Sequence, residues 1–263
     1  MNSYSSEATR SFKSFIGELT AVAAGLHVGI QEVASTLDAN DASDPWKALA
    51  YKHSVVVDGL TSQRIIRSAA RLNVVSLYSG FDLFLDDIRS DFFHLHGKEW
   101  IQHVGDDPFA ALVRNTHSRP EAHERRLGKH RIAAMNHYRL VRNAIAHPGK
   151  DAQRQTMTYY AEKADLLDEV RIEYRMQSAP NNIDELSFHD VKLLARVGLD
   201  LTKAIDAELD PGDERLFAML ELNQSEQKNS SQRDRNAWIG KLRTHYGVTA
   251  ERAARILREF LVH

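Results

Sequence analysis

The sequence predicts an all-α fold, and two observations support this prediction. Apolar residues recur at steps of three and four over long stretches, which is the period of an α-helix. Residues that interrupt helices are scarce, with 13 Gly and 6 Pro among 263 residues. A chain of this length buries a substantial core, as one large domain or as one domain with an appendage.

The composition excludes several classes of protein. The chain is 43% hydrophobic and 27% charged with a net charge of −2, so its total charge gives no argument for nucleic acid. It contains no cysteine, which excludes disulfides and thiolate metal sites. The most apolar stretch, 19–30, includes His27 and is too short to span a bilayer. The N-terminus lacks the order of a signal peptide. We expect a cytoplasmic protein that makes no membrane contact.

The N-terminal part of the chain reads as long helices separated by polar turns. Residues 7–37 carry an apolar stripe typical of one or two helices, and the polar segment 38–45 ends it. Residues 46–60 are ambiguous, because Val-Val-Val at 55–57 fits either a short strand or a helix. A long helix is expected over 61–94, and its unusually wide apolar face indicates a central position.

Shorter elements follow. Residues 95–127 read as a polar, mostly irregular insertion with a short helix near 107–114. A helix is expected over 156–168. Residues 170–176 alternate with period two, which indicates a short strand or an extended segment. A helix capped by Ser187 then runs to about residue 209.

The C-terminal part reads as a short helix over 213–222, a polar linker over 223–236 and a helical hairpin over 237–263. Thr249 caps the second helix of the hairpin, whose basic side holds Arg252, Arg255 and Arg258. The hairpin either docks on its own core or on a partner, or it forms part of a DNA-binding helix-turn-helix. We favour docking.

The most informative stretch is a helix end. Pro148 and Gly149 stop the preceding helix, so His147 lies at its C-terminal cap. The helix dipole favours a protonated imidazole there by roughly 0.3–2 kcal/mol. Asn143 shares the face of His147 and could orient the imidazole or bind the backbone, while Arg142 lies just beside that face. A guanidinium, an amide and an imidazole at one helix end suit the binding of a phosphate.

The spacing of Arg142 and His147 is not unusual by itself. In four places an Arg is followed by His five positions later: Arg89/His94, Arg125/His130, Arg142/His147 and Arg258/His263. Only Arg142 is followed by Asn, and only His147 is followed by Pro-Gly. The stretch 140–147 resembles the signature of the HEPN superfamily, an Arg, usually a polar residue, and a His after four to six residues. The competing interpretation is a helix-capping His beside a surface Arg.

The resemblance is to the stand-alone bacterial HEPN type and covers about residues 60–209. It implies a four- to five-helix bundle, followed here by the small C-terminal hairpin. It also implies a homodimer in which two motifs form one composite active site. The helix segment around Asp82 resembles the HEPN helix that precedes the motif helix, and an acidic residue there often faces the Arg/His pair. Asp82 is therefore expected to orient Arg142 or His147, unless it is a solvated carboxylate.

The segment around the motif is basic. Between Arg114 and Arg154 there are ten Arg or Lys residues and three acids, a surplus of seven positive charges. Such a surplus favours binding to an RNA backbone. The side chains that we expect to bind RNA are Arg139, Lys150, Lys129 and Arg131. Alternatively, these charges pair with acids elsewhere in the chain, such as Asp86 or Asp106.

Histidines also cluster in this segment. His117, His123 and His130 are spaced six and seven residues apart, and none forms an HExxH or an i, i+4 pair with a carboxylate ligand. We expect no metal site and no cofactor.

The sequence therefore predicts a metal-independent endoribonuclease of HEPN type that cleaves RNA by attack of the 2′-hydroxyl. Arg142 and His147 are the catalytic residues, with Asn143 and Asp82 in support. The predicted setting is a toxin or effector of a toxin–antitoxin or phage-defence system, with an antitoxin or defence-system partner. The alternatives are a non-catalytic HEPN module that binds RNA or dimerises and regulates a partner, and a DNA-binding regulator acting through the C-terminal hairpin.

The expected domain organisation follows from these segments. Residues 1–58 form a helical segment that packs on the core, and 59–222 form the HEPN-like domain with the motif. Residues 223–236 are the linker, and 237–263 are the C-terminal hairpin.

Overall fold

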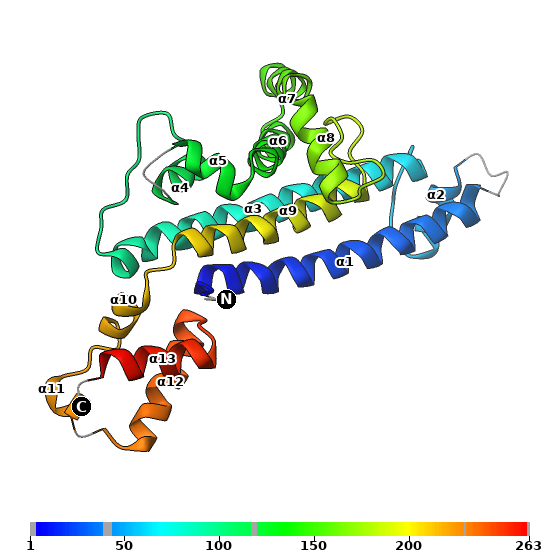
Figure 1. Ribbon diagram of the computed structural model, residues 1–263. Coiled ribbons are helices and arrows are strands. Elements are labelled where there is room, and N and C mark those ends of the chain that lie inside the picture. The colour runs from blue at the N-terminus through cyan, green and yellow to red at the C-terminus, as the bar shows by residue number, and fades with distance from the viewer. Residues whose placement is uncertain (1–3, 39–43, 117–119, 229, 262–263) are drawn as a thin grey trace. The chain divides into compact units, whose positions relative to one another are not determined.

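A computed structural model describes residues 4–38, 44–116, 120–228 and 230–261 (Figure 1). Helices account for 76% of the chain and the described residues form no strand, which confirms the all-α class. None of the described helices is both long enough and apolar enough to cross a bilayer. The helices, in chain order, are α1 (Glu7–Asp38), α2 (Pro45–Lys52), α3 (Ser62–His96), α4 (Pro108–Thr116), α5 (Pro120–Leu127), α6 (Lys129–Ala146), α7 (Lys150–Glu162), α8 (Ala164–Glu173), α9 (Phe188–Glu208), α10 (Asp213–Ala218), α11 (Gln224–Lys228), α12 (Gln232–Tyr246) and α13 (Ala250–Phe260).

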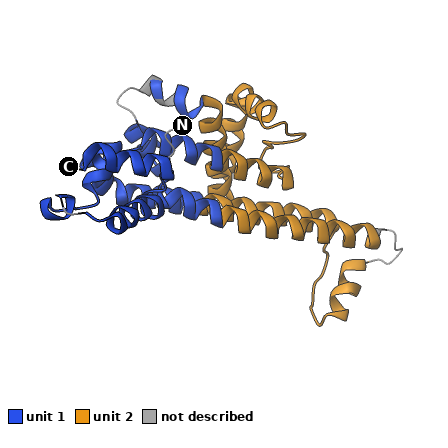
Figure 2. Ribbon diagram, turned by 60° about the horizontal axis from the view of Figure 1, so that its bottom comes forward, with its two compact units in different colours: residues 1–14, 81–128, 199–263 blue, residues 15–80, 129–198 orange. Residues whose placement is uncertain are grey.

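The chain forms two compact units (Figure 2). The first unit contains Met1–Ser14, Phe81–Gly128 and Leu199–His263, and the second contains Phe15–Gly80 and Lys129–Gly198. Three long helices, α1, α3 and α9, contribute residues to both units. The whole of α6, which ends at the Arg-Asn motif, belongs to the second unit.

The long helices agree with the sequence prediction. A single helix, α1, covers the segment expected to hold one or two helices, and α3 covers the expected long helix. The predicted cap of α9 is present, because the hydroxyl of Ser187 accepts a hydrogen bond from the backbone N–H of His189 at 3.2 Å. Residues 39–43 of the predicted polar turn lie outside the described residues.

Two ambiguous segments turn out differently. Residues 55–57 belong to neither a strand nor a helix, because α2 ends at Lys52. The strand or extended segment predicted over 170–176 is wrong, since α8 continues to Glu173. Buried Leu167, Val170 and Tyr174 are spaced by three and four, so burial in this segment follows the helical period.

The polar segments contain more helix than predicted. The insertion over 95–127 holds α5 in addition to the expected short helix α4. The predicted linker over 223–236 contains α11 and the start of α12. A capping box starts α12: the Ser231 hydroxyl accepts from the backbone N–H of Asp234, whose carboxylate accepts from the backbone N–H of Ser231. At the start of α12, a capping box therefore allows a helix to form in a segment whose polar composition indicated a linker.

The first unit has an aromatic core to which the C-terminal hairpin adds a second apolar cluster. The ring centroids of Phe12, Phe81 and Phe84 lie 5.6 to 5.8 Å apart, and that of Phe109 lies 5.5 Å from Phe81. The hairpin α12–α13 packs on α10. Buried members of this cluster come from the N-terminal segment, α10 and the hairpin, namely Tyr4, Leu216, Leu220, Leu242, Val248, Ala253, Ile256, Leu257 and Leu261. The hairpin thus docks on its own chain, which is one of the two kinds of docking that we favoured.

A buried ion pair fixes the hairpin. The side chain of Arg252 is 4% exposed and pairs with Asp210 at 2.5 Å and with Asp213 at 2.7 Å. Arg255 also reaches Asp213, at 2.7 Å. Two of the three arginines expected on a basic side of α13 therefore form ion pairs with acids of the first unit. This pairing weighs against the DNA-binding interpretation of the hairpin.

The second unit is organised around a buried carboxylate. Asp190, fully buried on α9, accepts hydrogen bonds from the hydroxyl of Tyr138 on α6 at 3.0 Å and from the backbone N–H of Ser187 at 2.9 Å. It also accepts from the backbone N–H of Asn181 at 2.8 Å and from its side-chain amide at 2.7 Å. Burial, together with Asp190, raises the pKa of Tyr138, so the phenol keeps the proton that it donates.

A buried histidine completes this network. His137 on α6 is fully buried, and its Nε2 lies 2.9 Å from the carbonyl oxygen of Asn181. Because a carbonyl only accepts, Nε2 carries the proton, which leaves Nδ1 buried with no hydrogen-bond partner in the described structure. Burial lowers the pKa of His137 to about 4. His137 is therefore neutral near pH 7.

We predict that Arg252→Met lowers the free energy of unfolding by about 3 kcal/mol, because it leaves the largely buried carboxylate of Asp210 without its guanidinium and Asp213 with Arg255 alone. Arg258→Met, at an exposed position on the same helix, is the control and changes stability by less than about 0.5 kcal/mol. Urea denaturation of the two variants measures the difference. Equal losses would contradict a role for the ion pair.

We predict that Asp190→Ala lowers the free energy of unfolding by about 3 kcal/mol, because it leaves several buried donors without an acceptor. Tyr138→Phe removes one donor and leaves the others paired, so it costs only about 1 kcal/mol. Both values come from chemical denaturation. A smaller loss for Asp190→Ala than for Tyr138→Phe would show that the carboxylate does not organise the network.

The pKa of His137 predicts a pH dependence of stability. The unfolded chain takes up a proton on this imidazole near pH 6.5 and the folded chain only near pH 4, so the unfolded state binds more protons between these values. The stability that the neutral ring contributes is full above about pH 6.5 and is lost as the pH falls toward 4. Over that range, wild type should lose about 3 kcal/mol more than His137→Gln. Denaturation experiments in which the stability of wild type and of His137→Gln changes equally with pH would refute this prediction.

Candidate functional site

The candidate site lies where α6 ends and α7 begins. The backbone N–H of His147 donates to the carbonyl of Asn143 at 2.8 Å, which is the last helical bond of α6. Pro148 and Gly149 follow, and α7 starts at Lys150. The helix therefore stops where the sequence predicts. Gly149 is extended, with φ of −166°, so this junction does not depend on the conformational freedom of glycine.

Arg142 and Asn143 are held together at this helix end. Both side chains are half-buried, and Nη1 of Arg142 donates to Oδ1 of Asn143 at 2.9 Å. The amide of Asn143 thus orients the guanidinium, whereas the sequence suggested that it would orient the imidazole or bind the backbone. A guanidinium whose position is fixed loses less entropy when it binds a phosphate.

His147 is exposed at the cap of α6. On an ideal helix, a residue five positions after Arg142 lies about 140° around the axis, and one four positions after Asn143 only about 40°. The imidazole is therefore closer in direction to Asn143 than to Arg142. Both the guanidinium and the imidazole reach solvent at the same end of the helix.

A small cleft of about 230 Å³ borders the same helix end and contains a residue that the sequence did not single out. Arg71 of α3 lines it beside Pro148 and Gly149. Its Nη2 donates to the carbonyl of Ile183 at 3.1 Å and lies 3.5 Å from Asp184, while its Nε is buried with no hydrogen-bond partner in the described structure. No sequence motif marks Arg71, because its proximity to the motif comes only from folding.

A second hollow, of about 500 Å³, runs between α6 and α7. It is lined by Arg139, which was expected to bind RNA, and by Arg154. It also contains Asp151 and Glu162, and Arg154 pairs with Asp151 at 2.8 Å. The charges along this groove are therefore balanced.

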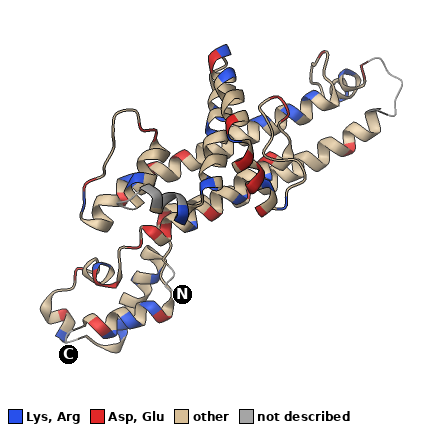
Figure 3. Ribbon diagram, turned by 45° about the horizontal axis from the view of Figure 1, so that its top comes forward, with Lys and Arg blue, Asp and Glu red and all other residues tan. Residues whose placement is uncertain are grey.

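Folding neutralises much of the basic surplus around the motif. Arg131, expected to bind RNA, pairs with Glu173 of α8, which also binds His130. Arg114 pairs with Asp106 at 2.9 Å, one of the acids that the sequence offered as alternative partners. Figure 3 shows both basic and acidic residues along the ribbon, although α6 itself carries no acidic residue.

The remaining predicted residues fall into two groups. Lys129 and Lys150 are exposed at the first residues of α6 and α7. Asp82 is half-buried on the part of α3 that belongs to the first unit, whereas the motif belongs to the second. Its expected role toward Arg142 or His147 stays a prediction.

The cluster of histidines lies partly outside the description. His117 and the side chain of His123 are not among the described residues, and His130 is bound to Glu173. Among the described side chains, no three of His, Cys, Asp or Glu gather in a way that could hold a metal ion.

The fold and the site define an all-helical protein with Arg, Asn and His at one exposed helix end. Comparison of the chain with protein-family models, curated proteins and solved structures finds no match. The likeness to the HEPN signature therefore rests on the motif residues themselves.

Proposed function

We propose that this protein is a metal-independent endoribonuclease of HEPN type. The observation that supports the proposal is the end of α6, where an exposed imidazole, His147, follows a guanidinium, Arg142, whose position Asn143 fixes. These groups are the ones that cleavage of RNA by its own 2′-hydroxyl requires.

In the proposed reaction, a nitrogen of His147 takes the proton of a ribose 2′-hydroxyl. The 2′-oxygen then attacks the adjacent phosphorus, so the bond from O2′ to phosphorus forms while the bond from phosphorus to O5′ breaks. Arg142 forks onto the phosphate oxygens and stabilises the charge that develops on them. A proton delivered to O5′ gives a 5′-hydroxyl product beside a 2′,3′-cyclic phosphate. Such a reaction needs no external nucleophile and no cofactor.

We expect the acid and the base to come from two copies of the motif. One protomer supplies a single exposed imidazole at the helix end, and proton removal and proton delivery occur on opposite sides of the phosphorus. A homodimer that brings two α6 ends together supplies both groups. The direction of His147 around the axis, away from Arg142, fits a site in which these residues act with those of a second copy.

Substrate binding is expected to use the surroundings of the motif. Lys150 and Arg139 flank the helix end, and the N-terminus of α7 begins three residues after His147. Backbone N–H groups at a helix N-terminus favour a phosphate. We expect RNA to approach along this junction. The assignment to a toxin or effector, with an antitoxin or defence-system partner, follows from the HEPN resemblance.

One observation favours a second candidate, a non-catalytic HEPN module that binds RNA or dimerises and regulates a partner. The pairing of Arg131 with Glu173 and of Arg154 with Asp151 reduces the positive field around the motif. A weaker field binds RNA less tightly, which suits a regulatory module better than an efficient nuclease.

Incubation of the purified protein with total RNA in the presence of EDTA tests the proposal. We predict cleavage that leaves 2′,3′-cyclic phosphate ends, detected by end analysis. His147→Ala should slow cleavage at least about 100-fold, because proton transfer is lost. Arg142→Ala should slow it about 100-fold, and Arg142→Lys less, since Lys keeps the charge but cannot fork onto a phosphate.

Exposed residues of the second unit serve as matched controls. His53→Ala and Arg64→Ala remove an imidazole and a guanidinium outside the motif and should leave cleavage unchanged. Equal losses in the controls would refute the assigned roles. A wild-type protein that binds RNA without cutting it would establish the module instead.

A further inference from the structure

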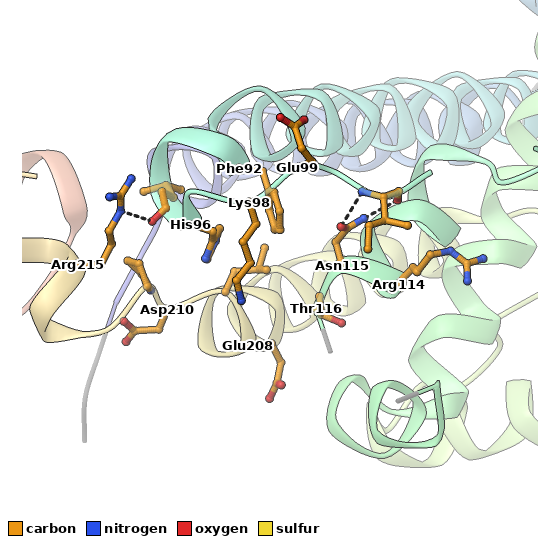
Figure 4. Close-up of a pocket in the computed structure, with 14 residues that line it drawn as sticks. Phe92, His96, Lys98, Glu99, Arg114, Asn115, Thr116, Glu208, Asp210 and Arg215 are labelled. Atoms are coloured by element: carbon orange, nitrogen blue, oxygen red, sulfur yellow. Dashed lines mark hydrogen bonds between the residues drawn. The ribbon is translucent and has the colours of Figure 1, made fainter. Parts of the chain in front are cut away.

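A cavity of about 610 Å³ lies in the first unit, at the C-terminal end of α3 (Figure 4). Residues of α4, of the end of α9 and of α10 complete its wall. Part of the lining is apolar, from Phe92, Leu95, Ile101 and Leu209. This volume is within the range of small-molecule sites, about 300–1,000 Å³, and the mixture of apolar and polar groups is typical of them.

A buried nitrogen in the wall lacks a hydrogen-bond partner. His96 lines the cavity, and its ring lies 4.6 Å from that of Phe92, centroid to centroid. Nε2 of His96 is buried and has no partner in the described structure. Burial, and secondarily the charges of Lys98 and Arg215, lowers the pKa of this imidazole. The ring is therefore neutral at pH 7, and a buried polar atom of this kind is stabilised by a ligand that bonds to it.

Three of the six Lys, Arg, Asp and Glu residues that line the cavity form ion pairs. Glu208 pairs with Arg126 at 2.7 Å, and Asp210 pairs with Arg252 at 2.5 Å. On the basic side, Arg114 is engaged by Asp106 in the same way. These three ion pairs contribute little net charge to the cavity.

Two further cations lie at the end of α3. Arg215 donates a hydrogen bond to the carbonyl oxygen of Leu95 at 3.1 Å. This bond gives a carbonyl at the end of α3 a partner but does not neutralise the charge of the guanidinium. Lys98 forms no ion pair or hydrogen bond in the described part of the chain. Figure 4 shows Lys98 pointing to the same side as His96, toward the ribbon of α9, whereas Glu99 points away. Since Glu99 also lines the cavity, the lining charges outside ion pairs are two positive and one negative, a surplus of one positive charge.

We propose that this cavity binds a small organic anion, a carboxylate or a phosphate carried on a flat apolar body. Lys98 pairs with the anionic group, Nε2 of His96 forms a hydrogen bond to the ligand, and Phe92 contacts the apolar body. The site lies in the first unit, whereas Arg142 and His147 lie in the second. It is thus independent of the proposed ribonuclease activity.

Calorimetric titration of the full chain with phenyl phosphate and with benzoate tests the proposal, and benzyl alcohol is the uncharged control. We expect at least one anion to bind, and whichever binds identifies the anionic group. Benzyl alcohol should bind at least about tenfold more weakly. Lys98→Met should weaken anion binding about tenfold, because the exposed side chain keeps its aliphatic part and loses only the charge.

Two more variants show whether the site is the one proposed. His96→Phe keeps an aromatic ring beside Phe92 but has no nitrogen, so it should also weaken binding about tenfold. Lys192→Met, at an exposed position of the second unit, should leave binding unchanged. The imidazole signals of His96 in NMR spectra should shift on addition of the anion.

The proposal is overturned if neither anion binds at millimolar concentration or if benzyl alcohol binds as well as the anions. Binding that Lys98→Met leaves intact, or that Lys192→Met weakens equally, overturns it as well. Circular dichroism of each variant confirms that the helices are retained, so that a loss of affinity reports on the cavity.

Discussion

The hydrogen bonds to the buried carboxylate of Asp190 are the constraint on which the second unit depends. A buried acceptor of this kind is tolerable only when donors surround it, and here they come from α6 and from the segment before α9. Tyr138 makes the bond from α6 and stands one helical turn before Arg142. The network therefore fixes both the rotation and the position of the helix that carries the candidate site. Losing the acceptor would leave several donors unpaired at once, which makes the arrangement cooperative.

How much the sequence reveals depends on whether a feature is local. The bounds of α3 and α9 were predictable, because a helical period is contained within the segment itself. The strand or extended segment expected at 170–176 was wrong, since a short alternating run also fits a helix that contacts two neighbours, as α8 contacts α6 and α7. The network around Asp190 was not predictable. It joins residues 52 positions apart that are unremarkable in the sequence.

The surface charge around the candidate site also could not be predicted from the sequence alone. Counting residues predicted a basic surface around the motif, but Arg131 meets Glu173 only after folding, from 42 positions away along the chain. The same holds for α13. Its arginines suggested a basic side, but Arg252 is buried and pairs with Asp210 and Asp213. Local charge counts overestimate a basic surface because they omit acids that the fold brings in. The sequence did predict the end of α6, at which His147 is exposed, because Pro148 disfavours the helical conformation of the residue before it.

The other histidines of α6 bear on how the candidate site would work. His130 is held by Glu173, and His137 is buried, neutral and bonded to Asn181. Neither lies at the helix end that carries the motif. If His147 is the base, a second copy of the motif is the source that we propose for the proton of the leaving oxygen. The burial that fixes α6 in place thus removes His137 as a local alternative, which supports our proposal that two motifs face one phosphate.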